Sequence, residues 1–242
     1  MNTLSEKTGS DRGPFFEKTG ASRPCWSCQS DQVADFNCMS CERIQDFLRD
    51  RDYFASFNLG YKLNIDLARL EKQYYELSRR FHPDYFQQRT KEEQEISLEN
   101  TALLNKAYQC LKDPEKRAAY LIRLIEGDAP EKTRAPAELF EDIFEIQEAL
   151  EERRGIDPSD TARYAALKQT LQAALEKMQS YREEEQARLS TAFLEWDQLE
   201  SKRRGFGFSP AQKSCLAQMK QTLAHTGYLD RVIQDINAAL AS

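Results

Sequence analysis

The stretch LARLEKQYYELSRRFHPD, residues 67–84, decides how this chain folds. Its apolar side chains recur at steps of three and four residues, which is the spacing of an amphipathic helix. They are Leu67, Leu70, Tyr74, Leu77 and Phe81. Because Pro83 disfavours helical geometry at the preceding residue, we expect the helix to end near Phe81. The His82-Pro83-Asp84 loop then lies on a rigid support, where recognition residues are often found.

Three further helices are expected around this one, within residues 53–124. A short helix precedes Gly60, and a long one begins in the nineties and runs through Leu111. Asp113-Pro114 restarts a helix, because Pro is tolerated in the first turn and Asp can cap it. We expect Asn64 to be the N-cap of the helix that leads into the His-Pro-Asp loop.

The second half of the chain predicts an antiparallel three-helix bundle. A linker over residues 126–136 contains Gly and Pro, which oppose helix formation. Three long helical patterns follow, at about 137–152, 160–200 and 210–241, and their connections are short enough for antiparallel neighbours. The fold class is therefore all-α: a four-helix unit at 53–124, a bundle at 137–241, and a small cysteine-containing segment before them.

Composition and charge limit the classes of function. The chain has 242 residues, of which 40% are hydrophobic and 31% are charged, so it can bury a core beneath a very polar surface. A formal net charge of −6 argues against a general nucleic-acid binder, which needs clustered Lys and Arg. No run approaches the ~18 consecutive apolar residues of a transmembrane helix. We therefore expect neither a nucleic acid nor a membrane as partner.

The first 23 residues are polar, show no hydrophobic period and are expected to be disordered. They lack the apolar segment of a secretory signal. They also contain several acidic residues, which are rare in transit peptides. A reducing cytoplasm is the simplest compartment, with the mitochondrial matrix as the alternative.

Residues 24–45 contain four of the six cysteines, as the two pairs Cys25-Trp-Ser-Cys28 and Cys38-Met-Ser-Cys41. Two such turns can place four thiolates around one ion, and a closed four-thiolate site predicts structural zinc. Iron, two disulfides or two redox pairs are the alternatives. Cys110 and Cys215 each stand alone in a helical pattern and are expected to be ordinary core or near-surface residues.

Residues 53–124 resemble a J-domain. The resemblance rests on the helix order, the loop and the later segments Leu104-Asn-Lys-Ala-Tyr108 and Lys116-Arg-Ala-Ala-Tyr120. It implies that a DnaK/HscA-type chaperone is contacted by His82, Pro83 and Asp84 and hydrolyses ATP faster as a result. It also implies that Lys72, Arg79 and Arg80 steer the encounter with an acidic surface of that chaperone. A merely solvated helix face is the alternative for these three basic residues.

The helix predicted from Ala137 carries many acidic residues and an apolar arc too wide for one core face. Phe140 and Phe144 extend this arc, so we expect an exposed apolar patch bordered by acid, which is typical of a protein-binding site. Deep burial between two other helices is the alternative.

This second half resembles the C-terminal domain of HscB-type co-chaperones of iron–sulfur cluster assembly, on Ala137-Glu-Leu-Phe-Glu141 and Tyr228-Leu-Asp230. The resemblance implies binding of an IscU-type scaffold protein. The implied contacts are apolar at Leu139, Phe140, Ile143 and Tyr228, and polar at Gln147 and Glu151. Phe144 and Gln147 stand where the bacterial pattern has acidic residues, and Ile146 and Leu150 are assigned to the core. Some members of the family carry a similar four-cysteine extension.

Together these features predict a co-chaperone that presents a cluster scaffold to a chaperone ATPase. No phosphate-binding loop is present, and His225, the other histidine, has no evident partner in the sequence, so we expect no enzyme. Self-association stays open. The alternatives are a general J-domain protein that binds unfolded clients, and a redox or iron-handling protein that works through the cysteines.

Overall fold

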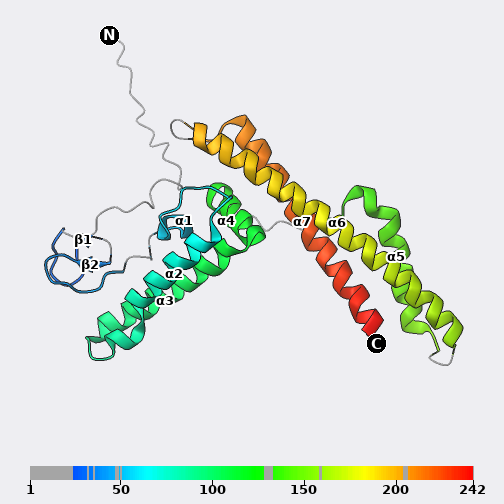
Figure 1. Ribbon diagram of the computed structural model, residues 1–242, viewed down its shortest axis with the longest axis horizontal. Helices are drawn as coiled ribbons and strands as arrows, with labels where there is room; N and C mark the ends of the chain where they lie inside the picture. The colour runs from blue at the N-terminus through cyan, green and yellow to red at the C-terminus, as the bar shows by residue number, and fades with distance from the viewer. Residues whose placement is uncertain are drawn as a thin grey trace, which may run out of the picture. The chain divides into compact units, whose positions relative to one another are not determined.

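The computed structural model describes residues 24–31, 33–34, 36–46, 49, 51–127, 133–157, 160–203 and 207–241, with backbone alone at 33–34. The segment predicted to be disordered, residues 1–23, lies outside this part of the chain. Helices dominate the described residues, which confirms the all-α fold class (Figure 1). These residues divide into two compact units. One runs up to Ile125 and includes Glu200–Phe208, and the other contains the remaining residues.

The first unit holds the cysteine segment and the four-helix fold. The strands β1 (Val33–Ala34) and β2 (Asn37–Cys38) form a small antiparallel hairpin. The helices that follow are α1 (Tyr53–Ser56), α2 (Leu67–Phe81), the 3-10 turn η1 (Pro83–Phe86), α3 (Lys91–Lys112) and α4 (Pro114–Glu126). Helices α2 and α3 lie side by side and run antiparallel, joined by η1 (Figure 1). Their buried faces meet at Leu70, Phe81, Leu104 and Leu111.

Short polar residues set the ends of these helices. Asp66, not Asn64 as expected, is the N-cap of α2, because its Oδ1 accepts from the backbone N–H of Arg69 at 3.1 Å. Thr90 and Glu93 form a reciprocal capping box at the start of α3. Asp113 caps α4 as predicted. Since α2 begins only at Leu67, that side chain lies at the edge of the apolar stripe and is 52% exposed, contrary to the expected pattern.

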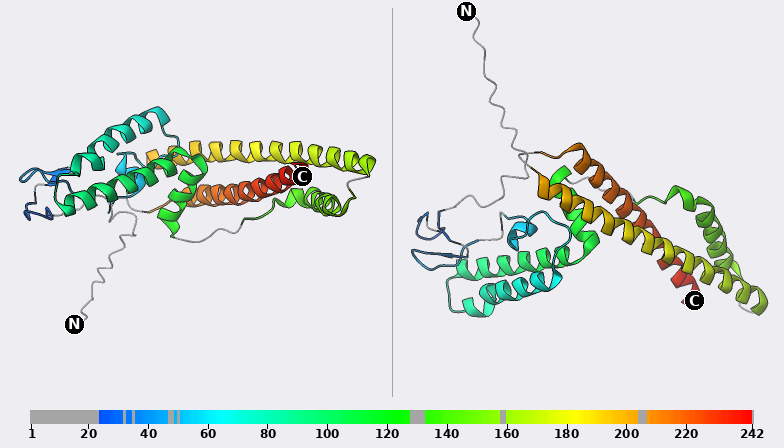
Figure 2. Two further views of the ribbon diagram at one scale, coloured as in Figure 1. Left: turned by 90° about the horizontal axis from the view of Figure 1, so that it is seen from below. Right: turned by 45° about the horizontal axis from the view of Figure 1, so that its top comes forward.

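The second unit is a helical bundle. It contains η2 (Ala137–Leu139), α5 (Phe140–Gly155), most of α6 (Thr161–Lys202) and α7 (Pro210–Ala241). Figure 2 shows α6 and α7 side by side along much of their length, with α5 near one end of the pair. Ile146 and Leu150 pack in the core, as predicted. None of the described helices is both long and apolar enough to cross a membrane.

Candidate functional site

The His-Pro-Asp loop is an exposed corner held by its own short-range contacts. His82 caps η1, because its Nδ1 accepts from the backbone N–H of Asp84 at 3.3 Å. The same Nδ1 lies 3.5 Å from a carboxylate oxygen of Asp84. The side chains remain 49% and 70% exposed, respectively. The loop can therefore present an imidazole and a carboxylate to a partner with little rearrangement.

The residue before this loop is fixed from behind by α3. Phe81 is fully buried, and its carbonyl oxygen accepts from Ser97 Oγ at 2.6 Å and from Thr101 Oγ1 at 3.1 Å. The last carbonyls of a helix have no partner within the helix, so these two hydroxyls supply the missing donors. The end of α2, and with it the start of the loop, is thereby tied to one turn of α3.

The basic residues of α2 lie on its solvent-facing surface. Lys72, Arg79 and Arg80 are all exposed, as the sequence pattern predicted. The Arg80 guanidinium also stacks over the ring of Phe36, with 5.0 Å between its Cζ and the ring centroid. Lys72 and Arg79 thus face solvent, while Arg80 also contacts the cysteine segment.

Two exposed tyrosines extend the surface around the loop. Tyr85 is 69% exposed and its ring meets His82 edge-on, with 6.1 Å between centroids. Tyr75 on α2 is 54% exposed. The sequence analysis did not select either residue. Two features of the sequence could have identified them: Tyr85 directly follows the loop, and Tyr75 lies beside the apolar stripe of the helix.

The four cysteines of the first unit converge on one point. Their sulfur atoms all lie within 4.8 Å of one another, and the Cys25–Cys41 and Cys28–Cys38 separations are both 3.6 Å. A tetrahedral ion with metal–sulfur bonds of ~2.3 Å separates its sulfurs by about 3.8 Å, whereas a disulfide bond is about 2 Å long. The four cysteines can therefore hold a metal ion.

The two Cys-x-x-Cys turns have the same backbone geometry. In each, the N–H of the residue after the second cysteine donates to the carbonyl of the first, at 2.9 Å for Gln29 and 2.8 Å for Glu42. Both of these residues have φ near +60°. In each turn a serine N–H also points to the first sulfur at 3.4 Å. Backbone donors aimed at sulfur favour the thiolate, which is the form that binds metal.

The acidities of these thiols follow from this arrangement. Burial alone raises the pKa of Cys25, but the amides of Cys28 and Ser27 and the neighbouring thiols outweigh it and lower the pKa to about 6. The amide of Ser30 lowers the pKa of Cys28, but burial and the other three thiols outweigh it and raise the pKa to about 12. Without a cation, the thiols must therefore share protons, because four negative charges cannot lie this close together.

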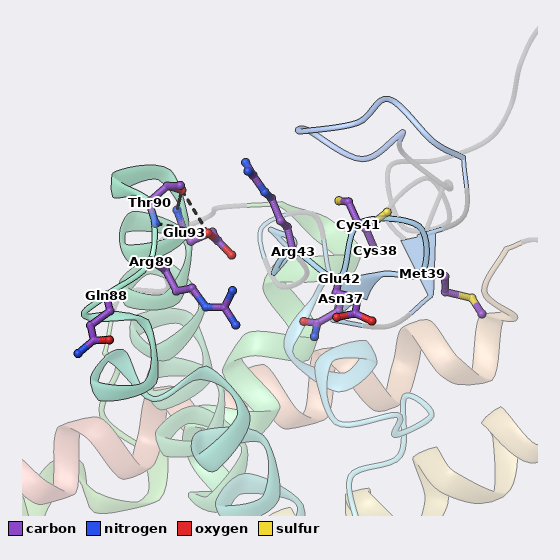
Figure 3. A pocket seen from close by; sticks show the side chains of 10 residues that line it. All are labelled: Asn37, Cys38, Met39, Cys41, Glu42, Arg43, Gln88, Arg89, Thr90 and Glu93. Carbon is purple, nitrogen blue, oxygen red and sulfur yellow. Dashed lines mark hydrogen bonds between the residues drawn. The ribbon is translucent and has the colours of Figure 1, made fainter.

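A cavity of about 710 Å³ separates the cysteine hairpin from the start of α3. Figure 3 shows Arg43 and Cys41 on the hairpin side, with Arg89 and the hydrogen-bonded pair Thr90 and Glu93 on the opposite side. The hollow is open and mainly polar. The cysteine segment and the residues that follow the His-Pro-Asp turn therefore face each other across this cavity.

The outer surface of α5 carries the exposed aromatic patch expected there. Phe140 and Phe144 are 74% and 63% exposed. Gln147 and Glu151 are exposed on the same side of the helix, which excludes the deeply buried alternative for this face. Tyr228 is half-buried against the bundle core.

Two of the predicted contact residues are not on this surface. Leu139 is fully buried and Ile143 is only 8% exposed, because both point into the core shared with α6 and α7. Their apolar spacing did not distinguish a core position from a contact position. His225 also differs from expectation, since its Nδ1 lies 3.1 Å from the buried carboxylate of Glu185.

Comparison with known proteins supports the J-domain and the likeness to HscB-type co-chaperones. The DnaJ domain family matches residues 58–120. The iron-sulfur cluster co-chaperone protein HscB of Mus musculus is 33% identical over 132 residues, which are 52% of this chain and 56% of that protein. The Homo sapiens protein is 32% identical over 142 residues, which are 56% and 60% of the two chains. The matched region thus spans little more than half the length of these curated relatives.

Solved structures extend the likeness over most of the chain. The crystal structure of human co-chaperone protein HscB has a TM-score of 0.53 at 23% identity and covers 88% of this chain and 97% of that one. Chaperone HscB from Vibrio cholerae has a TM-score of 0.54 at 24% identity, covering 77% and 96%. The chain therefore contains a DnaJ domain, and its resemblance to HscB-type J-domain co-chaperones is confirmed in sequence and in fold.

Proposed function

We propose that this chain is a co-chaperone that stimulates the ATPase of an HscA/DnaK-type chaperone and delivers an IscU-type scaffold to it during iron–sulfur cluster assembly. The observation that carries the proposal is the exposed His82-Pro83-Asp84 corner at the end of a basic helix in a DnaJ domain. The likeness to HscB co-chaperones supports the iron–sulfur context. The chaperone supplies the hydrolysis chemistry, so the chain itself is not an enzyme.

The chaperone-facing surface combines a specific contact with electrostatic steering. Asp84 accepts a charge-assisted hydrogen bond from a cationic side chain of the chaperone. Pro83 restricts the loop backbone and so lowers the entropy lost on docking. Lys72, Arg79 and Arg80 attract an acidic partner surface, an effect that added salt weakens.

The scaffold-facing surface is the aromatic patch of α5. Phe140 and Phe144 supply apolar contacts, joined by the half-buried Tyr228 of α7, and Gln147 and Glu151 supply the polar rim. The exposure of both phenylalanines supports this role. Leu139 and Ile143 act indirectly, because their burial in the core fixes the direction of α5.

The metal is a structural zinc ion, held by Cys25, Cys28, Cys38 and Cys41. Four thiolates leave no open coordination position, so the ion supplies folding free energy and no Lewis-acid chemistry. Reduced thiols suit a reducing compartment, and we propose the cytoplasm, with the mitochondrial matrix as the alternative.

A steady-state ATPase assay of the cognate chaperone tests the proposal. The wild-type chain should accelerate hydrolysis, more so with scaffold present, and His82→Gln should lose this effect while still binding scaffold. Stimulation by unfolded peptides in place of the scaffold would favour a general J-domain protein. Full activity of His82→Gln, with loss of function on cysteine substitution, would favour the redox or iron-handling alternative.

A further inference from the structure

We propose that the four-cysteine module is a clamp on the His-Pro-Asp loop: when it holds its metal, it orders the loop through the positioning residues Phe36, Gln45 and Asn100. Metal occupancy would then set how strongly the chain engages its chaperone. The inference rests on the proposed function for its consequence, but the clamp itself is a property of this chain and can be measured alone.

The first connection runs through Gln45. Its Nε2 donates to Cys25 Sγ at 3.3 Å, and its backbone oxygen accepts from Asn100 Nδ2 on α3 at 2.9 Å. Gln45 and Asn100 are both buried. Hydrogen bonds to coordinating atoms orient the ligands of a metal site. One residue therefore contacts a metal-binding sulfur and the middle of α3.

The same part of α3 holds the end of α2. Asn100 is adjacent to Thr101 and three residues from Ser97, and these two hydroxyls donate to the carbonyl oxygen of Phe81. Phe81 directly precedes His82. Hydrogen bonds thus connect Cys25 with α3, and α3 with Phe81, the residue directly before the loop.

The second connection is aromatic. Phe36 lies between the two cysteine pairs, and its ring meets Phe81 edge-on at 5.2 Å between centroids with an interplanar angle of 74°. The Arg80 guanidinium stacks on the same ring. The backbone oxygen of Phe36 also accepts from the N–H of Gln45 at 2.8 Å. Phe36 therefore contacts the last two residues of α2, and its position depends on the closed hairpin.

The hairpin needs the metal to keep these positions. Its strands have two residues each, and Ile44 is its one large aliphatic side chain that is fully buried among the described residues. So small a segment cannot supply a hydrophobic core of its own, and a metal provides the missing folding free energy. Without the ion, Phe36 and Gln45 would leave α2 and α3, which would expose one side of Phe81 and break the hydrogen bond from the buried Asn100 amide to the backbone oxygen of Gln45.

The test uses hydrogen–deuterium exchange of the full-length chain, comparing a segment at residues 78–86 with α4 as internal reference. Removing metal with a chelator should accelerate exchange at 78–86 by about tenfold and accelerate exchange in α4 much less. Phe36→Ala should give the same local change while still binding one metal ion per chain. Met39→Ala is the matched control, since this hairpin residue is 69% exposed and should change neither segment.

Asn100→Ala tests the other connection without altering the cysteine segment, and it should also accelerate exchange at 78–86. Unchanged exchange at 78–86 in the chelated protein and in both variants would overturn the clamp, and so would equal acceleration at α4. In the ATPase assay, Phe36→Ala should raise the concentration of the chain needed for half-maximal stimulation about fivefold. The maximal ATPase rate should stay the same, because only the fraction of loops ordered for binding is smaller. If the wild-type chain does not stimulate the ATPase of the chaperone, the proposed function is wrong. The exchange experiment still shows, independently, whether the cysteine segment orders the loop.

Discussion

At the scale of single residues, exposure separates positions that face solvent from positions that support them in the core. Phe140 and Leu139 are neighbours in the sequence, yet one is 74% exposed and the other is fully buried. In the same way, Asp84 faces solvent while Phe81, three residues earlier, lies in the core. Substitution of a buried residue should therefore lower the free energy of unfolding, whereas substitution of an exposed residue should weaken binding to a partner.

Leu139→Ala should destabilise the bundle by about 2–5 kcal/mol, because it leaves a cavity in a closed core. Phe140→Ala should leave the free energy of unfolding within about 0.5 kcal/mol of wild type, since its ring is already in water. The measurement is denaturant unfolding of the full-length chain. Equal destabilisation by the two variants would contradict the burial that separates them.

The affinity for the scaffold should depend instead on the exposed aromatic residues of α5. Phe140→Ala and Phe144→Ala should each weaken binding by about 1–2 kcal/mol, as expected for aromatic residues at the centre of an interface. Titration calorimetry with an IscU-type scaffold measures this loss. Leu194→Ala, at an exposed apolar residue of α6, is the control, and an equal loss there would show that the α5 patch is not specific.

At the scale of elements, α2 presents a charged face and α3 supports the loop from behind. The role proposed for the basic residues of α2 is long-range attraction, whereas the hydroxyls of Ser97 and Thr101 act through direct hydrogen bonds. Salt weakens the first kind of interaction much more than the second.

Lys72→Glu with Arg79→Glu should reduce stimulation of the chaperone, and most of all at low ionic strength. Raising salt from about 50 to about 300 mM should narrow the gap to wild type, because the Debye length shortens to less than about 10 Å. ATPase stimulation measured across this range checks the prediction. A gap that is independent of salt would instead indicate a direct contact.

Thr90→Ala removes the side-chain cap of α3 and should cost about 1 kcal/mol of stability. Thr90→Ser keeps the hydroxyl and should cost much less. Thermal unfolding followed by circular dichroism compares the two. Similar losses in both variants would mean that the capping hydrogen bond contributes little.

At the scale of the whole molecule, the chain consists of two units with separate cores. The four clustered cysteines belong to one unit, and the α5 patch belongs to the other. Binding of a metal stabilises only the structure that contains its ligands.

Chelation of the metal should therefore lower the unfolding temperature of the cysteine-containing unit and leave that of the bundle unchanged. Differential scanning calorimetry of the full-length chain should resolve the two transitions, and added Zn²⁺ should restore the first. A shift of both transitions by the same amount would show that the units unfold together.

The sequence by itself determined the elements of this fold and their order. Apolar spacing of three and four residues, Pro83 and the Asp113-Pro114 restart predicted helices that the structure contains, because these signals act within a few residues of the backbone. Paired Cys-x-x-Cys turns likewise predicted four converging thiols.

Only the tertiary structure decided which side of each helix faces a neighbour. Leu139, Ile143, Phe140 and Phe144 all belong to one wide apolar arc, and packing against α6 and α7 buries the first two and leaves the others in solvent. Phe36 contacts Phe81 of α2, which lies 45 positions later in the sequence, and Gln45 contacts Asn100 of α3, which lies 55 positions later. Such long-range contacts leave no periodic signal, since they depend on how separate elements meet in space.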